Sequence, residues 1–342
     1  MIIPSKSDVL ISGIQPVSLA FASILSFCGL KVLVVDELKK PDLNSKSLNL
    51  SVYNILLLQH IGFTIEANTS QFSFVNQSLK LLATHLSNVV WDTQIIEKSQ
   101  NNYQLKHNNL SSLHESKFIY FSDDLIVDQK DNELNFRNAF VLAWRVVAIV
   151  NETFTTKILF SYKKEKEILQ QYAGEKSQFQ KIREKLIGKK KTNFHLADSK
   201  INLHLSHKRE LQAGDILPDL AFYDEQLKAD SSLYNWCKYA HFSIIIFGYL
   251  GPTNLFSLAR WLQLNYPIQL FYLPQSEKNE SIFKALHISL GEKKTLIIRP
   301  DRYLAFVSDT VDMDIIDNYL NNVLGMNELS IKNKTKLIKP RY

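Results

Sequence analysis

Glycine is scarce in this chain of 342 residues. It has ten glycines, whereas an average content of roughly 7% would give more than twice as many. Only Gly13, Gly29 and Gly62 occur before residue 170. Backbone that wraps around a phosphate needs glycine, because it must approach the ligand closely and adopt positive φ angles. The shortage therefore argues against a well-formed nucleotide-binding loop.

Cysteine and uninterrupted apolar runs are lacking too. Cys28 and Cys237 are the only cysteines, which excludes a disulfide framework and a cysteine-based zinc site. Both lie among apolar residues, so we expect buried thiols and a reducing, cytoplasmic location. The first apolar stretch follows no basic region and is interrupted by Pro16 and Gly29, which predicts neither a signal peptide nor a membrane span.

Positive charge is in modest excess, with a formal net charge of +6. The basic residues gather in "KLIGKKK" (185–191) and in "IKNKTKLIKPRY" at the end of the chain. Aromatic residues do not alternate with them as in many nucleic-acid-binding faces, so we expect a solvated linker and tail. Binding to nucleic acid or to an anionic surface is the alternative. His204 and His207 have no cysteine or carboxylate cluster beside them, and we predict no metal site.

What is present near the N-terminus is the outline of a dinucleotide-binding βαβ unit. An apolar strand (8–12), a turn "GIQPVS" (13–18), a helix (16–28) and a second strand (31–35) follow one another. The expected turn reads G-x-G-x-x-G. Gly13 keeps its first glycine, whereas Gln15 and Ser18 replace the second and third. Asp36 ends the second strand, where an acid binds the ribose of an adenosine.

The rest of the chain divides into further α/β segments. We predict helices at 47–63, 77–87 and 134–150, a hairpin at 89–108, a short strand at 117–124 and a charged helical connector from 155. From residue 242 the order becomes β-α-β-α-β-β-α, which is typical of a thioredoxin-like fold. The predicted organisation is a Rossmann-like domain with a parallel sheet and a β-hairpin (1–154), a connector (155–205), a thioredoxin-like domain (206–328) and a basic tail (329–342).

Four segments together carry a resemblance to a family. "DVLISGIQPVSL" resembles D-V-L-I-V-G-A-G-P-V-G-L, and "RNAFVLAWRVV" resembles Q-D-A-x-N-L-A-W-K-L. "SYKKEKE" resembles S-Y-x-x-E-R-x-P, and "LIIRPDRYLAF" resembles L-V-R-P-D-G-x-V-A-W. These motifs are similar to those of the class A FAD-dependent aromatic hydroxylases, phenol-hydroxylase-like monooxygenases with a C-terminal thioredoxin-like domain.

The resemblance implies FAD bound with its pyrophosphate at the first helix, and NAD(P)H as reductant if the chain is active. Asp123 matches either the family's D-G motif, with Asp124 replacing glycine, or its later G-D motif, with Ser122 replacing glycine. The cofactor-binding candidates are Gly13, Gln15, Pro16, Ser18, Asp36 and Asp123.

Several positions depart from the family pattern. Glu37 and Tyr53 stand where arginines are usual, and "IVDQKDNELN" (126–135) replaces a loop rich in glycine and proline. Too few residues separate "SDD" (122–124) from the next helix to build a substrate-binding sheet. A thioredoxin-like C-x-x-C is also missing, because "GYLGPT" (248–253) stands in its place.

These departures lead to two functional predictions, and we nominate no catalytic residue. The first is a truncated, degenerate scaffold that forms a homodimer or binds an intact hydroxylase, without nucleic acid or membrane. The alternative is a functional FAD-binding oxidoreductase of the aromatic-hydroxylase type with an altered cofactor cradle.

Overall fold

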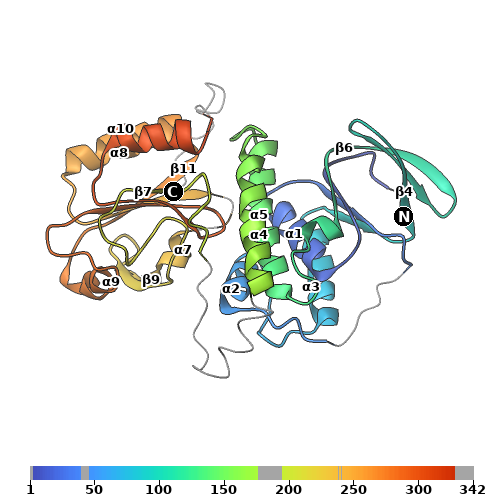
Figure 1. Cartoon of the computed structure of the whole chain (residues 1–342), viewed down its shortest axis with the longest axis horizontal. Coiled ribbons are helices and arrows are strands. Elements are labelled where there is room, and N and C mark those ends of the chain that lie inside the picture. Colours follow the sequence, from blue (N-terminus) through green and yellow to red (C-terminus); the bar gives the residue numbers. More distant parts are fainter. Residues whose placement is uncertain (1–2, 40–45, 176–194, 238, 240, 328–342) are drawn as a thin grey trace. The chain divides into compact units, whose positions relative to one another are not determined.

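The computed structural model describes residues 3–39, 46–175, 195–237, 239 and 241–327. The basic run at 185–191 and the predicted tail at 329–342 lie outside these residues. The chain divides into two compact units (Figure 1): unit 1 comprises residues 1–150 and 166–186, and unit 2 comprises residues 151–165 and 187–342.

Unit 1 contains a six-stranded sheet in the order β3-β2-β1-β6-β5-β4. Its strands are β1 (Lys6–Ser12), β2 (Val32–Val35), β3 (Asn88–Val90), β4 (Thr93–Ser99), β5 (Asn102–His107) and β6 (Leu110–Phe121). β1 runs parallel to β2 and β6, and β2 runs parallel to β3. β5 is antiparallel to both β4 and β6. The predicted βαβ unit and the hairpin are confirmed. The predicted short strand at 117–124 is wrong in extent, because β6 begins at Leu110 and makes the hairpin a three-stranded meander.

The helices of unit 1 bury one face of this sheet. They are α1 (Pro16–Phe27), α2 (Val52–His60), α3 (Gln71–Thr84) and α4 (Asn132–Val150). Residues Val17–Ser26 of α1 are all buried, because α1 packs against the sheet and against α3 and α4. Gly29 and Gly62 have φ angles of +88° and +104° and end α1 and α2, as their positions predict.

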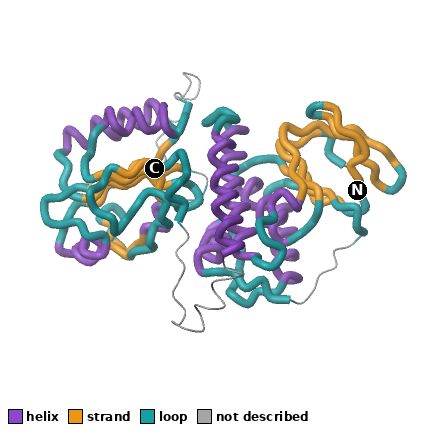
Figure 2. The backbone as a smooth tube through the Cα atoms, viewed as in Figure 1, coloured by secondary structure: helices purple, strands orange, loops and turns teal. Residues whose placement is uncertain are grey.

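An apolar cluster between the parallel strands and β5 shows how the sheet curves. Leu10, Leu33 and Val35 of the parallel strands pack with Tyr103 and Leu105 of β5. The strands therefore bend toward one another instead of forming a flat sheet (Figure 2).

Unit 2 contains a five-stranded sheet in the order β11-β10-β12-β13-β7. Its strands are β7 (Leu203–His204), β10 (Phe242–Phe247), β11 (Ile268–Leu273), β12 (Lys294–Ile298) and β13 (Leu304–Ser308). The helices of this unit are α7 (Leu233–Trp236), α8 (Pro252–Asn265), α9 (Glu280–Ala285) and α10 (Met313–Asn318), and β8 (Ala221–Asp224) pairs with β9 (Ala229–Ser232) in a separate ribbon. The order of elements from β10 to α10 is the one predicted, and the thioredoxin-like assignment stays a prediction from that order.

One helix contributes to both units. α5 (Ile158–Glu175) belongs to unit 2 as far as Glu165 and to unit 1 from Lys166 onward. This boundary falls inside the segment predicted as a connector. None of the helices in the described part of the chain is both long enough and apolar enough to cross a membrane.

Candidate functional site

The carboxyl ends of β1, β2 and β6 meet at one edge of the sheet in unit 1. Ser12 is opposite Val35 of β2 and opposite Phe121 of β6. The chain leaves β1 toward β2 and β3 and later returns to the other side of β1 as β6, so the strand order reverses there. In open α/β sheets, ligands bind in the crevice at such a switch point.

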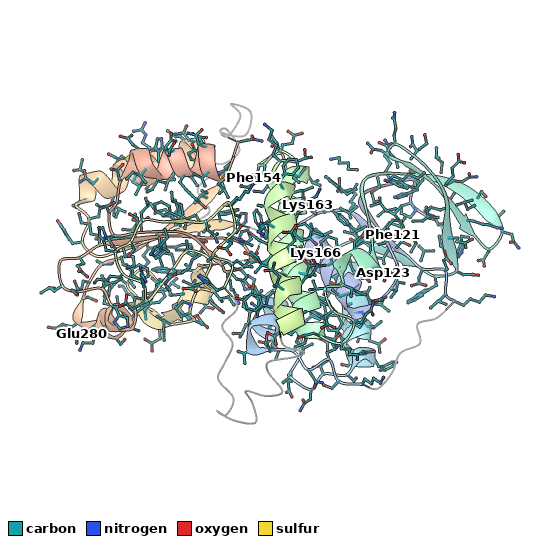
Figure 3. The ribbon with its side chains drawn as sticks, viewed as in Figure 1. Phe121, Asp123, Phe154, Lys163, Lys166 and Glu280 are labelled. Atoms are coloured by element: carbon teal, nitrogen blue, oxygen red, sulfur yellow. The ribbon has the colours of Figure 1, made fainter. Side chains whose placement is uncertain are left out.

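The six predicted cofactor-binding residues converge on this edge. The turn 13–18 follows β1, Asp36 follows β2, and Asp123 lies in the 3-10 helix η1 (Ser122–Leu125) after β6. Asp123 is exposed next to Phe121, the last residue of β6 (Figure 3).

Gly13 occupies a position that accepts no side chain. Its φ is +95°, and a Cβ built on its backbone would lie 2.4 Å from Ser122 Oγ. Its amide donates to Val35 O at 2.8 Å, which ties the turn to β2. The first glycine of the predicted turn is therefore required by both conformation and space.

Asp36 fastens the turn from the end of β2. Its Oδ2 accepts a hydrogen bond from the amide of Ile14 at 2.5 Å, and its Oδ1 accepts one from the amide of Leu38 at 2.8 Å. A carboxylate oxygen has more than one acceptor site, so these bonds leave capacity for a ligand hydroxyl. Asp36 is a positioning residue as well as the predicted ribose ligand.

Ser18 closes the other side of the turn. Its hydroxyl accepts from the amide of Gln15 at 2.9 Å and lies 2.7 Å from Gly13 O, to which it can donate. The amide of Gln15 is therefore bound by a side chain of the turn itself. Pro16 has no N–H, and the first hydrogen bond of α1 runs from Leu19 N to Gln15 O. The amides of Val17 and Ser18 precede that bond, in the part of a helix that attracts anions.

The loop after η1 is held by helix α4. Asn135 Oδ1 accepts from the amides of Val127 and Asp128 at 2.7 and 3.1 Å, and its Nδ2 donates to Asp128 O at 2.7 Å. Asn138 Nδ2 donates to Leu125 O at 3.0 Å. Sequence reasoning missed the role of Asn135, because nothing in the local pattern marks a side chain that reaches back along the chain. A side chain of α4 thus occupies two backbone amides of this loop.

Lys166 supports the same loop from α5. Its Nζ donates to Asp124 O at 2.6 Å, and burial lowers the pKa of this lysine. Asp124 Oδ2 in turn accepts from the amide of Phe121 at 3.0 Å. The position of η1 beside Gly13 is therefore fixed by side chains from two helices.

A polar cleft of about 510 Å³ adjoins Asp36. Two backbone hydrogen bonds join the wall of the cleft to the segment that contains Asp36. Thr93 N donates to Asp36 O at 2.8 Å, and Asp92 N donates to Leu38 O at 3.0 Å. The cleft is lined by Glu37, Lys39, Asp92, Thr93, Gln94, Lys106, Asn108 and Asn109. The sequence did not reveal it, since its walls come from the end of β2 and from the β4–β5 hairpin.

The two thiols are poor nucleophiles. Burial raises the pKa of both Cys28 and Cys237 to about 12, so each is protonated at neutral pH. The segment "GYLGPT" joins β10 to α8, where a thioredoxin-like active site would carry its cysteines. The structure therefore gives unit 2 no reactive thiol at this helix.

Comparison with solved structures gives the fold of most of the chain. A ternary complex of aklavinone-11 hydroxylase with FAD and aklavinone matches 94% of this chain and 100% of its own, with a TM-score of 0.73 and 11% identity. The flavin-dependent monooxygenase PieE, in complex with FAD and substrate, matches 93% and 99%, with a TM-score of 0.69 and 9% identity. The anhydrotetracycline hydroxylase OxyS from Streptomyces rimosus matches 94% and 100%, with a TM-score of 0.65 and 13% identity.

The chain has the fold of these hydroxylases and of this flavin-dependent monooxygenase. No family model and no curated protein matches the sequence. At 9–13% identity the likeness establishes the architecture, and the resemblance predicted from the four sequence motifs is confirmed at the level of fold. The expected loss of a substrate-binding sheet stays a prediction.

Proposed function

We propose that this chain binds FAD at the carboxyl edge of its six-stranded sheet and is an oxidoreductase of the aromatic-hydroxylase type. The observation that carries the proposal is the convergence of the Gly13 turn, Asp36 and Asp123 at the switch point of the sheet. The hydroxylases of the same fold, two of which were solved with FAD, support it.

The residues at this edge fit the ADP half of FAD. The amides of Val17 and Ser18 open α1, where the helix dipole favours a pyrophosphate. Gly13 provides backbone without a side chain, and Asp36 can accept a ribose hydroxyl beside the polar cleft. Asp123 would face the ribityl and phosphate side. When bound, FAD supplies redox chemistry, with NAD(P)H as the expected reductant.

The proposal is tested by titrating the purified chain with FAD. We expect flavin absorbance to co-purify with the protein or FAD fluorescence to be quenched on mixing. Asp36→Ala removes the ribose ligand and the acceptor of the Ile14 amide, so it should raise the dissociation constant of FAD about tenfold or more. Glu115→Gln removes an exposed carboxylate that pairs with Lys6 and serves as the matched control. A folded chain that takes up no FAD contradicts the proposal.

The second candidate function is a degenerate scaffold that works as a homodimer or as the partner of an intact hydroxylase. It is favoured by the side-chain bond that occupies the Gln15 amide and by the Asn135 contacts with the loop at 127–128. A wild-type chain without FAD affinity, together with a Gln15→Gly, Ser18→Gly variant that gains it, would favour this candidate. It would also identify the two side chains as the cause.

A further inference from the structure

An apolar groove lies between helix α3 and strand β3 of unit 1, and we refer to it as the α3–β3 groove. Its volume is about 570 Å³, and it shares no lining residue with the polar cleft beside Asp36. Five of its lining residues are apolar and none is charged; they are Leu79, Ala83, Leu86, Ser87, Asn88, Val89 and Trp91. A hollow of this size, with a few polar groups among apolar ones, has the character of a small-molecule site.

Leu86 lines the α3–β3 groove in a backbone conformation that leucine rarely adopts. Its φ is +58°, and its side chain is 84% exposed. Helix α3 ends here in a Schellman motif, because Leu86 N donates to Ala83 O at 3.2 Å and Ser87 N donates to Leu82 O at 2.9 Å. The residue at this position of the motif is usually glycine, since a side chain strains the backbone there. The chain therefore carries an exposed apolar side chain at the groove at some cost in stability.

Trp91 supplies an aromatic surface to the α3–β3 groove. Val89 and Trp91 alternate with Val90, whose side chain is buried in the apolar cluster on the other face of the strand. The backbone of Trp91 is held in place, because its carbonyl accepts from Thr93 Oγ1 at 2.9 Å and lies 3.1 Å from His107 Nδ1. Its side chain is half-buried and pairs with no other aromatic ring among the described residues. A half-exposed indole on a fixed backbone suits a planar aromatic ligand.

Lys80 places a positive charge beside the α3–β3 groove. It lies one helical turn before the lining residue Ala83, so the two are neighbours on the surface of α3. Glu66 is the only other charged residue between positions 47 and 91. Lys80 forms no ion pair in the part of the chain that the structure describes, and Asp92, the next carboxylate along the chain, lines the polar cleft instead. Apolar walls and an unpaired cation at their edge are thus combined at one place.

We propose that the α3–β3 groove binds a small planar aromatic molecule that carries one carboxylate. The ring lies against the Trp91 indole and under Leu86, and the carboxylate pairs with Lys80. A cationic ligand would find no carboxylate on these walls and a neutral one would leave Lys80 unpaired, so charge complementarity favours the acid. Strand β3 is only three residues long and offers few backbone groups to an added peptide strand. The groove contains none of the proposed FAD-binding residues, so this site does not depend on FAD.

The test is isothermal titration calorimetry of the full chain with 2-naphthoate and with 2-naphthamide, which has the same ring system without the charge. We expect 2-naphthoate to bind with a dissociation constant on the order of 0.1 mM and 2-naphthamide to bind about fivefold more weakly. Lys80→Gln should remove this difference. Trp91→Leu should raise the dissociation constant for 2-naphthoate about tenfold, because the ring loses its stacking surface.

Leu86→Gly separates ligand binding from folding. Glycine adopts positive φ without strain, so this variant should be at least as stable in urea as the wild-type chain, yet it should bind 2-naphthoate about fivefold more weakly. Leu290→Gly removes a leucine that is 88% exposed in unit 2 and should leave the affinity unchanged.

Other results would overturn the proposal. A wild-type chain that binds no 2-naphthoate at about 1 mM contradicts it. Equal affinities of the wild-type, Leu86→Gly and Trp91→Leu chains would place the ligand elsewhere, and equal binding of acid and amide would contradict the pairing with Lys80. If 2-naphthoate does not bind and Leu86→Gly lowers the sedimentation coefficient, a second copy of the chain occupies the groove instead.

Discussion

Gly13 and Gly29 have similar positive φ angles, of +95° and +88°, but different surroundings. A Cβ at Gly13 would meet Ser122 Oγ at 2.4 Å, whereas a Cβ at Gly29 would have nothing within 4 Å. Gly29→Ala should therefore cost about 1 kcal/mol of stability from backbone strain alone. Gly13→Ala adds a steric clash and should cost about 3 kcal/mol.

Urea denaturation of the two alanine variants measures this difference. The glycine pair forms its own control, because the strain is common to both and the clash is not. Equal losses of stability would mean that Ser122 moves aside freely and that the turn is not packed tightly against η1. The loss in Gly13→Ala should also be accompanied by weaker FAD binding, which Gly29→Ala should not show.

At one position the motif comparison predicts the backbone conformation but not the residue. The resemblance leads one to expect glycine at position 302, and the structure has Arg302 there with φ of +63°. Its guanidinium carbon lies 3.9 Å from the centroid of the Tyr234 ring. The backbone conformation of the motif is kept, and the ring contact offsets the strain of a side chain in that conformation. A motif letter alone could not predict that contact.

His114 on β6 joins two elements through a buried side chain. Its Nδ1 lies 2.6 Å from Pro4 O, so this nitrogen carries a proton, and its Nε2 lies 2.8 Å from Ser7 Oγ. Burial lowers the pKa of His114, although the hydrogen bond to Pro4 and the charge of Glu115 act in the opposite direction. The folded chain thus binds a proton here less readily than the unfolded chain, and stability is lost as the pH falls below about 6.5.

The expected slope is at most about 1.4 kcal/mol per pH unit for this one group. It can be measured as the free energy of unfolding in urea between pH 7.5 and 5, for the wild-type chain and for His114→Gln. The glutamine variant should be less stable at pH 7.5 and should show a smaller loss toward pH 5. Parallel pH profiles for the two chains would rule out His114 as the source.

A helix or strand can be predicted from the sequence when the residues that determine it are neighbours in the chain. β1, α1 and β2 were predictable because their apolar residues are contiguous. The first half of β6 was not, since "LSSLHESK" (110–117) resembles a polar loop until its pairing with β5 is known. The convergence of Gly13, Asp36 and Asp123 was predictable from the parallel strands that they end. The polar cleft at Lys39 and Lys106 could not be predicted, because its walls come together only through tertiary packing.

At the scale of the whole molecule, a fully buried charge cluster anchors α5 within unit 2. The Arg299 guanidinium, at the end of β12, binds Glu165 of α5 through two bonds of 2.7 and 3.0 Å and also binds Asp301. Ser199 donates to the Glu165 carboxylate as well. All three charged side chains are fully buried. Burial acts to lower the pKa of Arg299, but the two carboxylates outweigh it and raise this pKa above its usual value. Arg299 therefore pairs with both carboxylates inside the core.

These pairings predict unequal effects of two substitutions. Arg299→Met removes the cation that binds two buried carboxylates and should cost about 3–5 kcal/mol, whereas Glu165→Gln keeps the Arg299–Asp301 pair and should cost roughly 1–2 kcal/mol. Hydrogen exchange followed by mass spectrometry locates the damage. In Arg299→Met, protection should fall in β12, β13 and residues 158–165, while β1 and β2 of unit 1 keep theirs. Loss of protection throughout the chain would mean that the two units unfold together, and equal costs for the two variants would contradict the charge argument.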